Sequence, residues 1–142
     1  MWRNVLAIPA GLVVTALVVM GLQWVSSSIS PLPPGVDPMD PADAEAFAEH
    51  VSGLPLITWA IVFLSELLGA FLGGIVAGRV ATSRKRWFSA AIVGLALLGS
   101  LFNWTSFSHP AWFVAGQLLL YPLVLFLVWF TVEPRAGAQT HD

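Results

Sequence analysis

The chain has 142 residues, of which 57% are hydrophobic and only 10% charged. A soluble domain of this size cannot bury so much apolar surface, so the composition excludes that class and indicates a polytopic helical membrane protein. The sequence has no cysteine, which excludes disulfides and thiolate metal sites. Its one short basic cluster is too small for nucleic-acid binding, and the net charge is −2.

Four apolar segments are each long enough to cross a bilayer as a helix, which takes about 20 residues. We expect spans at about 4–25, 56–80, 87–104 and 111–132, with a loop at 26–55, a turn at 81–86 and a polar tail at 133–142. The first span is too long for the apolar core of a cleaved signal peptide, which is the competing interpretation. The predicted fold class is an all-α membrane protein, a four-transmembrane-helix bundle that forms a single domain over residues 1–142.

The loop at 26–55 has six prolines, five acidic residues and no Lys or Arg. Its Asp40-Pro41 pair is typical of a helix start, because Asp40 can cap free N–H groups and proline suits the first helical position. Gly53 marks the expected end of this helix. Phe47 and Val51 lie on its apolar side. The loop therefore predicts a short amphipathic helix on the outer surface of the bundle.

All the basic residues fall on one side of a four-span arrangement, namely Arg3, Arg79, Arg84, Lys85, Arg86 and Arg135. The positive-inside rule places this side, with both termini and the turn at 81–86, in the cytoplasm. The loop at 26–55 is then outside. Tryptophans near the span ends are typical of interfacial anchors, which supports the same span boundaries.

The second span is the segment around which we expect the bundle to form. It contains two GxxxG spacings, at 69/73 and 74/78, and small residues let helix backbones approach closely in a membrane. We expect this span to pack through one face, on which Gly73 lies, and the small-residue-rich third span to be the partner of that face. Gly78 lies away from the face, so Leu should be tolerated better at Gly78 than at Gly73. The predicted helix-packing residues are Gly69, Ala70, Gly73, Gly74, Ala77 and Gly94.

One acidic residue, Glu66, lies about ten residues from the outer end of the second span. A charged carboxylate at that depth costs at least about 3 kcal/mol, and no Lys or Arg lies at the same depth to offset this cost. We therefore expect Glu66 to be mostly protonated. Its hydrogen bond should go to Tyr121, to Thr15 or to the Leu118 carbonyl, which a following proline leaves without its helical partner. The predicted intramembrane polar layer consists of Glu66, Tyr121, Thr15 and Gln117.

Two interpretations of Glu66 stay open. In one, the carboxyl group is a polar clamp that joins helices. In the other, it binds a proton or a cation. A lone acid, with neither a second acid nor a basic partner, favours the clamp.

No other pattern indicates a chemical site. Asp37, Asp40 and Asp43 do not fit a calcium-binding loop, because the closing Glu is absent. His50 and His109 lie in connecting segments and lack metal-ligand spacing. We therefore predict no catalytic residue, no metal site and no cofactor.

The loop PLPPGVDPMDPADAEAFAEHV, followed by SELLGAFLGGIVAGRVA and by PAWF at the start of the last span, resembles uncharacterised small four-span bacterial inner-membrane proteins. The resemblance implies a multi-pass protein of the bacterial inner (plasma) membrane and names no activity. We expect a non-enzymatic protein that acts through helix packing, as an accessory or scaffold subunit of a membrane complex or as a homo-oligomer. Its partners would be the lipid bilayer and either another membrane protein or a second copy. The alternative is a small channel or carrier that uses Glu66 as an intramembrane proton or cation site.

Overall fold

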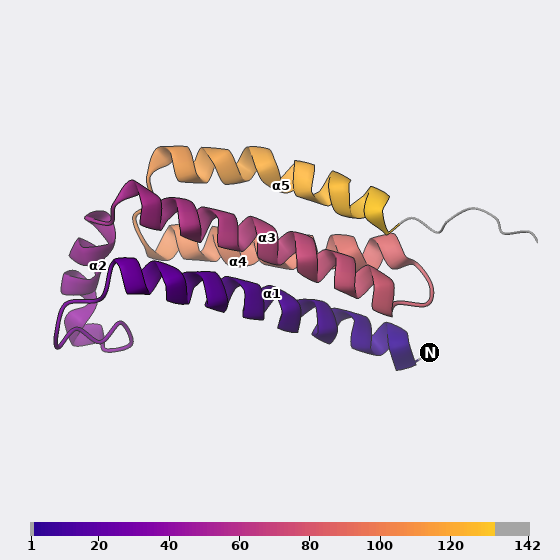
Figure 1. Cartoon of the computed structure of the whole chain (residues 1–142), viewed down its shortest axis with the longest axis horizontal. Coiled ribbons are helices and arrows are strands. Elements are labelled where there is room, and N and C mark those ends of the chain that lie inside the picture. The colour runs from indigo at the N-terminus through magenta and orange to yellow at the C-terminus, as the bar shows by residue number, and fades with distance from the viewer. Residues whose placement is uncertain (1, 133–142) are drawn as a thin grey trace, which may run out of the picture.

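A computed structural model describes residues 2–132, which form α-helices, one turn of 3-10 helix and loops (Figure 1). The α-helices are α1 (Trp2–Ile29), α2 (Ala44–Ser52), α3 (Leu56–Val80), α4 (Lys85–Ser106) and α5 (Ala111–Thr131). Four of them, α1, α3, α4 and α5, are long and apolar enough to cross a membrane. This confirms the predicted all-α fold with four candidate spans. The predicted tail at 133–142 lies outside the described residues.

Two of the long helices, α1 and α4, extend beyond the predicted spans at both ends, and hydroxyl side chains lie in their last turns. In α1, Ser28 Oγ donates a hydrogen bond to the Trp24 carbonyl over 2.9 Å. In α4, the hydroxyl groups of Thr105 and Ser106 both donate to the Phe102 carbonyl. Such bonds satisfy the polar side chains within their own helix, so these hydroxyl groups need no partner elsewhere.

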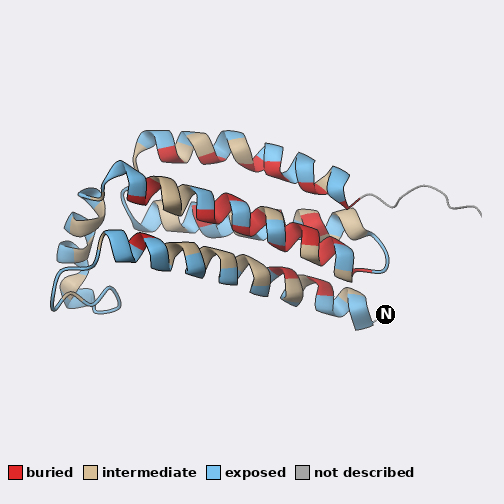
Figure 2. Cartoon of the chain, in the orientation of Figure 1, coloured by how far each residue is buried: buried red, intermediate tan, exposed pale blue. Residues whose placement is uncertain are grey.

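Helix α3 lies at the centre of the bundle, with α1 along one side, α5 along the opposite side and α4 behind it (Figure 1). Figure 2 shows that buried residues are concentrated on α3 and on the sides of the other helices that face it. The expectation that α3 packs through a single face is therefore too narrow. The central core cluster consists of Leu67, Ala70, Ile75, Val93, Tyr121, Val124 and Val128.

One end of the bundle holds the start of α1, the turn between α3 and α4, and the end of α5 (Figure 1). Arg3 Nε donates a hydrogen bond to the Val80 carbonyl over 3.1 Å, which satisfies a carbonyl at the end of α3. Asn4 Oδ1 accepts hydrogen bonds from the Thr82 backbone N–H and the Thr82 hydroxyl. The first turn of α1 is thus fixed to the turn that follows α3.

Helix α2 lies across the opposite end of the bundle (Figure 1). It follows a turn of 3-10 helix, Pro41–Asp43, in which Asp40 accepts a hydrogen bond from the Ala42 N–H over 2.9 Å. Phe47 packs edge to face against Phe107, with ring centroids 5.4 Å apart. Val51 is half-buried beside the same end of the bundle. These contacts anchor the apolar side of α2 to the helices below it.

Candidate functional site

The carboxyl group of Glu66 joins three helices. Its Oε2 atom accepts hydrogen bonds from Ser100 Oγ of α4 over 2.6 Å and from Gln117 Nε2 of α5 over 2.8 Å. All three side chains are buried. Burial strengthens each of these bonds, since no water competes for the same atoms. A single oxygen atom of α3 therefore links α3 to both α4 and α5.

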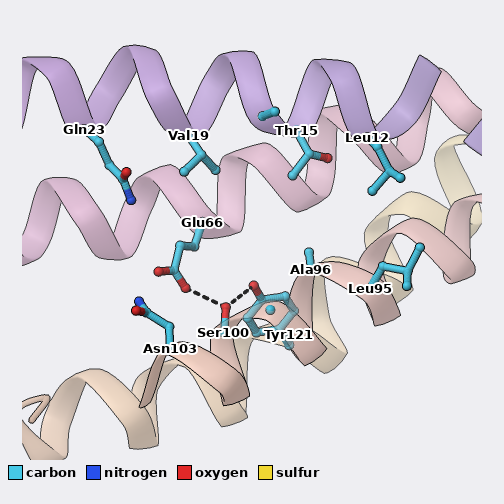
Figure 3. A pocket seen from close by; sticks show the side chains of 12 residues that line it. Leu12, Thr15, Val19, Gln23, Glu66, Leu95, Ala96, Ser100, Asn103 and Tyr121 are labelled. Carbon is cyan, nitrogen blue, oxygen red and sulfur yellow. Dashed lines mark hydrogen bonds between the residues drawn. The ribbon is translucent and has the colours of Figure 1, made fainter. Parts of the chain in front are cut away.

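Tyr121 joins this site through Ser100 rather than by direct contact with Glu66. The Tyr121 hydroxyl lies 2.8 Å from Ser100 Oγ (Figure 3). Ser100 has one hydroxyl proton and donates it to Glu66, so Tyr121 must be the donor to Ser100. The result is a directed chain of hydrogen bonds from Tyr121 to Ser100 to Glu66.

Gln117 can serve either protonation state of Glu66. As placed, its N–H group donates to Glu66, and its own carbonyl oxygen, Oε1, is buried without a hydrogen-bond partner. A half-turn of the side-chain amide exchanges donor for acceptor, and Gln117 then accepts a hydrogen bond from the O–H of a neutral carboxyl group. The amide therefore holds Glu66 in position whether or not it is ionised.

Thr15 does not belong to this hydrogen-bonded group, contrary to expectation. Its hydroxyl donates to two backbone carbonyls at 3.0 Å, that of Gly11 in its own helix and that of Gly69 in α3. The Leu118 carbonyl is not a partner of Glu66 either. Ser100 of α4, which was not among the expected partners, bonds Glu66 instead.

A slot of about 560 Å³ lies between α1 and α4, next to the hydrogen-bonded side chains of Glu66, Ser100 and Tyr121. We refer to it as the α1–α4 slot. Figure 3 shows its walls, with Gln23 and Leu12 toward opposite ends of α1, and Asn103 and Leu95 correspondingly placed on α4. Glu66 lines the slot together with Tyr121, Ala16 and Gly99. Ala16 and Gly99 are exposed, so the slot opens sideways to the surroundings of the bundle.

The glycines of α3 pack against more than one helix, so the expectation that α4 is their partner is only partly right. Gly74 and Gly78 do approach α4, but Gly69 and Gly73 pack closely against α1. A Cβ atom added at Gly73 would overlap Thr15 Oγ1 and would lie 2.6 Å from the Gly11 carbonyl oxygen. A Cβ atom at Gly69 would lie 3.1 Å from the Thr15 carbonyl oxygen. The backbones of α1 and α3 therefore approach too closely for a side chain at these positions. Gly11, on the α1 side, was not identified from the sequence.

Of the remaining predicted packing residues, all but Gly94 pack against another helix. Ala70 and Ala77 are fully buried, and a Cβ atom at Gly74 would lie 3.0 Å from Val128 Cγ1 of α5. Gly94 has nothing within 4 Å of an added Cβ atom, so it makes no close helix contact. Gly78 is also tightly packed, because an added Cβ atom would overlap Ser89 Oγ and approach Val132. These are side-chain atoms, whereas Gly73 meets the backbone of Gly11, so the expected ranking of the two positions stays a prediction.

Residues 2–132 contain no group of three or more His, Asp or Glu side chains placed to hold a metal ion. His109 instead packs against Trp59, with ring centroids 5.2 Å apart. Its Nδ1 atom lies 2.8 Å from the Phe107 carbonyl oxygen. His109 thus contributes to the packing of the bundle end near α2.

None of the family models, curated proteins or solved structures compared with this chain matches it.

Proposed function

We propose that this chain is a non-enzymatic multi-pass membrane protein that works through helix packing, as an accessory or scaffold subunit of a membrane complex or as a homo-oligomer. The observation that carries the proposal is the pair of hydrogen bonds that Glu66 accepts from other helices. Its Oε2 atom binds side chains of two neighbouring helices in the same chain. A carboxyl group held in this way is a clamp that fixes the arrangement of α3, α4 and α5.

The surface of α4 supports a partner in the membrane. Gly94 is exposed, and no other part of the described chain approaches its Cβ position. Glycine inside a helix costs about 1 kcal/mol relative to alanine, and no contact within this chain offsets that cost. Beside Gly94, an apolar hollow of about 210 Å³ lies between α4 and α5, next to Pro122. A side chain from a partner helix, or from a second copy, fits such a hollow.

The charge distribution supports an orientation with both termini in the cytoplasm of a bacterial cell and α2 outside its inner membrane. The described basic residues all belong to the end of the bundle opposite α2. The acidic residues of the loop at 26–55 belong to the α2 end. An excess of Lys and Arg marks the cytoplasmic side of an inner-membrane protein.

The test compares Gly94→Leu with Gly21→Leu. Both glycines are exposed on long helices and have nothing within 4 Å of an added Cβ atom, so neither change should disturb the bundle itself. We expect the wild-type protein and Gly21→Leu to purify in mild detergent as a complex larger than one chain. Gly94→Leu should give the single chain, with unchanged thermal unfolding. The measurement is native mass spectrometry, and a wild-type protein that is a lone chain would contradict the proposal.

The second candidate function is a channel or carrier with a proton or cation site at Glu66, and the free oxygen atom of the carboxyl group favours it. Both hydrogen bonds of the carboxyl group end on Oε2, and the other oxygen, Oε1, faces the α1–α4 slot (Figure 3). Glu66→Gln keeps the hydrogen-bonding shape and removes the titrating group. If the clamp is the only role, Glu66→Gln should keep near-normal stability, whereas Glu66→Ala should lose about 1 kcal/mol. Ion flux in proteoliposomes that Glu66→Gln abolishes at normal stability would establish the second candidate instead.

A further inference from the structure

We infer that the α1–α4 slot is a binding site for a cationic amphiphile, a molecule with a positively charged amine head group and one apolar chain, which enters from the membrane. The slot has about 560 Å³, within the roughly 300–1,000 Å³ typical of small-molecule sites. Its exposed wall residues, Ala16 and Gly99, open it sideways, toward the lipid that would surround the long helices. A ligand dissolved in the bilayer therefore reaches it directly.

The slot is polar at one end and apolar at the other. Gln23 and Asn103 face each other at the end nearer α2, whereas Leu12 and Leu95 lie farther along the same two helices (Figure 3). An amphiphile placed parallel to the helices matches this order, with its head group near the α2 end and its chain among the leucines. A wholly apolar molecule leaves the polar end unused.

Three polar groups in the slot lack a partner within the part of the chain that the structure describes. The side-chain amides of Gln23 and Asn103 make no hydrogen bond, and neither does Glu66 Oε1. Figure 3 shows Oε1 turned toward the space between these two amides. Polar side chains at membrane depth are costly unless paired, so their convergence on one open space points to a ligand head group.

The charge of the site selects a cation. Glu66 is the only acidic residue that lines the slot, and no Lys or Arg lines it. The only other titratable group on its walls is Tyr121 of α5, since α1 and α4 contribute only neutral side chains. A positive head group beside Oε1 neutralises the carboxylate without disturbing the bonds to Oε2. The acidic loop at 26–55, which has no Lys or Arg, raises the local concentration of cations at this end of the bundle.

Binding of the amphiphile does not depend on the scaffold role, and the two proposals fail separately. A single chain that binds the amphiphile supports this inference and contradicts the scaffold role. A complex that does not bind the amphiphile supports the scaffold role and contradicts this inference.

The experiment measures binding of radiolabelled dodecyltrimethylammonium, whose charge does not titrate, to the purified full chain by equilibrium dialysis against protein-free detergent micelles. Labelled dodecanol is the neutral probe of equal chain length. Gly99→Leu fills the slot from α4, where an added Cβ atom meets nothing within 4 Å. Gly21→Leu is the matched control, because Gly21 is equally open and does not line the slot.

We expect saturable binding of the cation to the wild type and to Gly21→Leu, and binding weaker by roughly tenfold or more in Gly99→Leu. Glu66→Gln should weaken binding of the cation to a similar extent, while binding of dodecanol stays unaffected. Equal cation binding by Gly99→Leu and Gly21→Leu would place the ligand elsewhere and overturn the inference. Equal affinity for dodecanol and the cation, with no effect of Glu66→Gln, would overturn the charge selection.

Discussion

At the scale of single residues, Ser100 is central to the buried hydrogen-bonded cluster, because its one hydroxyl joins Tyr121 to Glu66. Ser100→Ala removes two hydrogen bonds, whereas Tyr121→Phe removes one. Interhelical hydrogen bonds in membranes contribute about 0.6 kcal/mol each, so we expect losses of about 1 kcal/mol for Ser100→Ala and about half that for Tyr121→Phe. Thermal unfolding in detergent measures both.

The double variant of Ser100 and Tyr121 tests whether Tyr121 is held through Ser100. Once Ser100 is alanine, Tyr121 has no partner to lose, so adding Tyr121→Phe should cost almost nothing more. Ser106→Ala is the control, since the Ser106 hydroxyl bonds only within its own exposed helix turn. Fully additive losses would show that Tyr121 is held by something other than Ser100.

Part of this site could be predicted from single residues, and part could not. Glu66, Gln117 and Tyr121 are polar groups deep in apolar spans, and the last two are four residues apart, hence on one face of α5. Their large polar groups need partners outside their own helix, which makes them conspicuous. The short hydroxyl groups of Thr15 and Ser100 bond equally well to a backbone or to another helix, so the sequence gives no way to choose between the two.

The close contact of α1 with α3 is the organising feature at the scale of elements. Leu at Gly73 would meet Thr15 and the backbone of Gly11, neither of which can withdraw while both helices stay straight. We expect Gly73→Leu to cost about 2 kcal/mol or to prevent assembly, as overpacking commonly does. Gly21→Leu, which meets nothing within 4 Å, should unfold like the wild type. The measurements are thermal unfolding and size-exclusion chromatography in detergent, and equal stability of the two variants would contradict the contact.

The sequence predicts that the glycines of α3 pack against another helix, but it does not predict which helix. A GxxxG spacing indicates that another helix approaches, but it carries no information about which helix. The third span is rich in small residues and was the natural choice. Gly94 and Gly99 of that span face outward instead, while the single Gly11 of α1 makes the close contact.

At the scale of the whole molecule, the four long helices could be predicted and their arrangement could not. The length and hydropathy of each apolar segment determine whether it can cross a bilayer. Lipid chains and protein interiors are equally apolar, however, so an apolar residue gives no sign of whether it faces one or the other. The central place of α3, which is buried on several sides, is therefore visible only in the structure.

The orientation of the bundle in the membrane depends on the distribution of charge rather than on packing. Arg3, bonded to the end of α3, and the cluster at 84–86 lie at one end of the bundle, and the acidic loop belongs to the other. Translocating several clustered bases across the inner membrane is unfavourable, so this end should stay in the cytoplasm. Reporters fused after Asp142 or inserted at 82–86 should give a cytoplasmic signal, and one inserted at 30–39 an external signal. An external signal from the C-terminal fusion would mean an odd number of spans, and would return the first helix to the role of a cleaved signal.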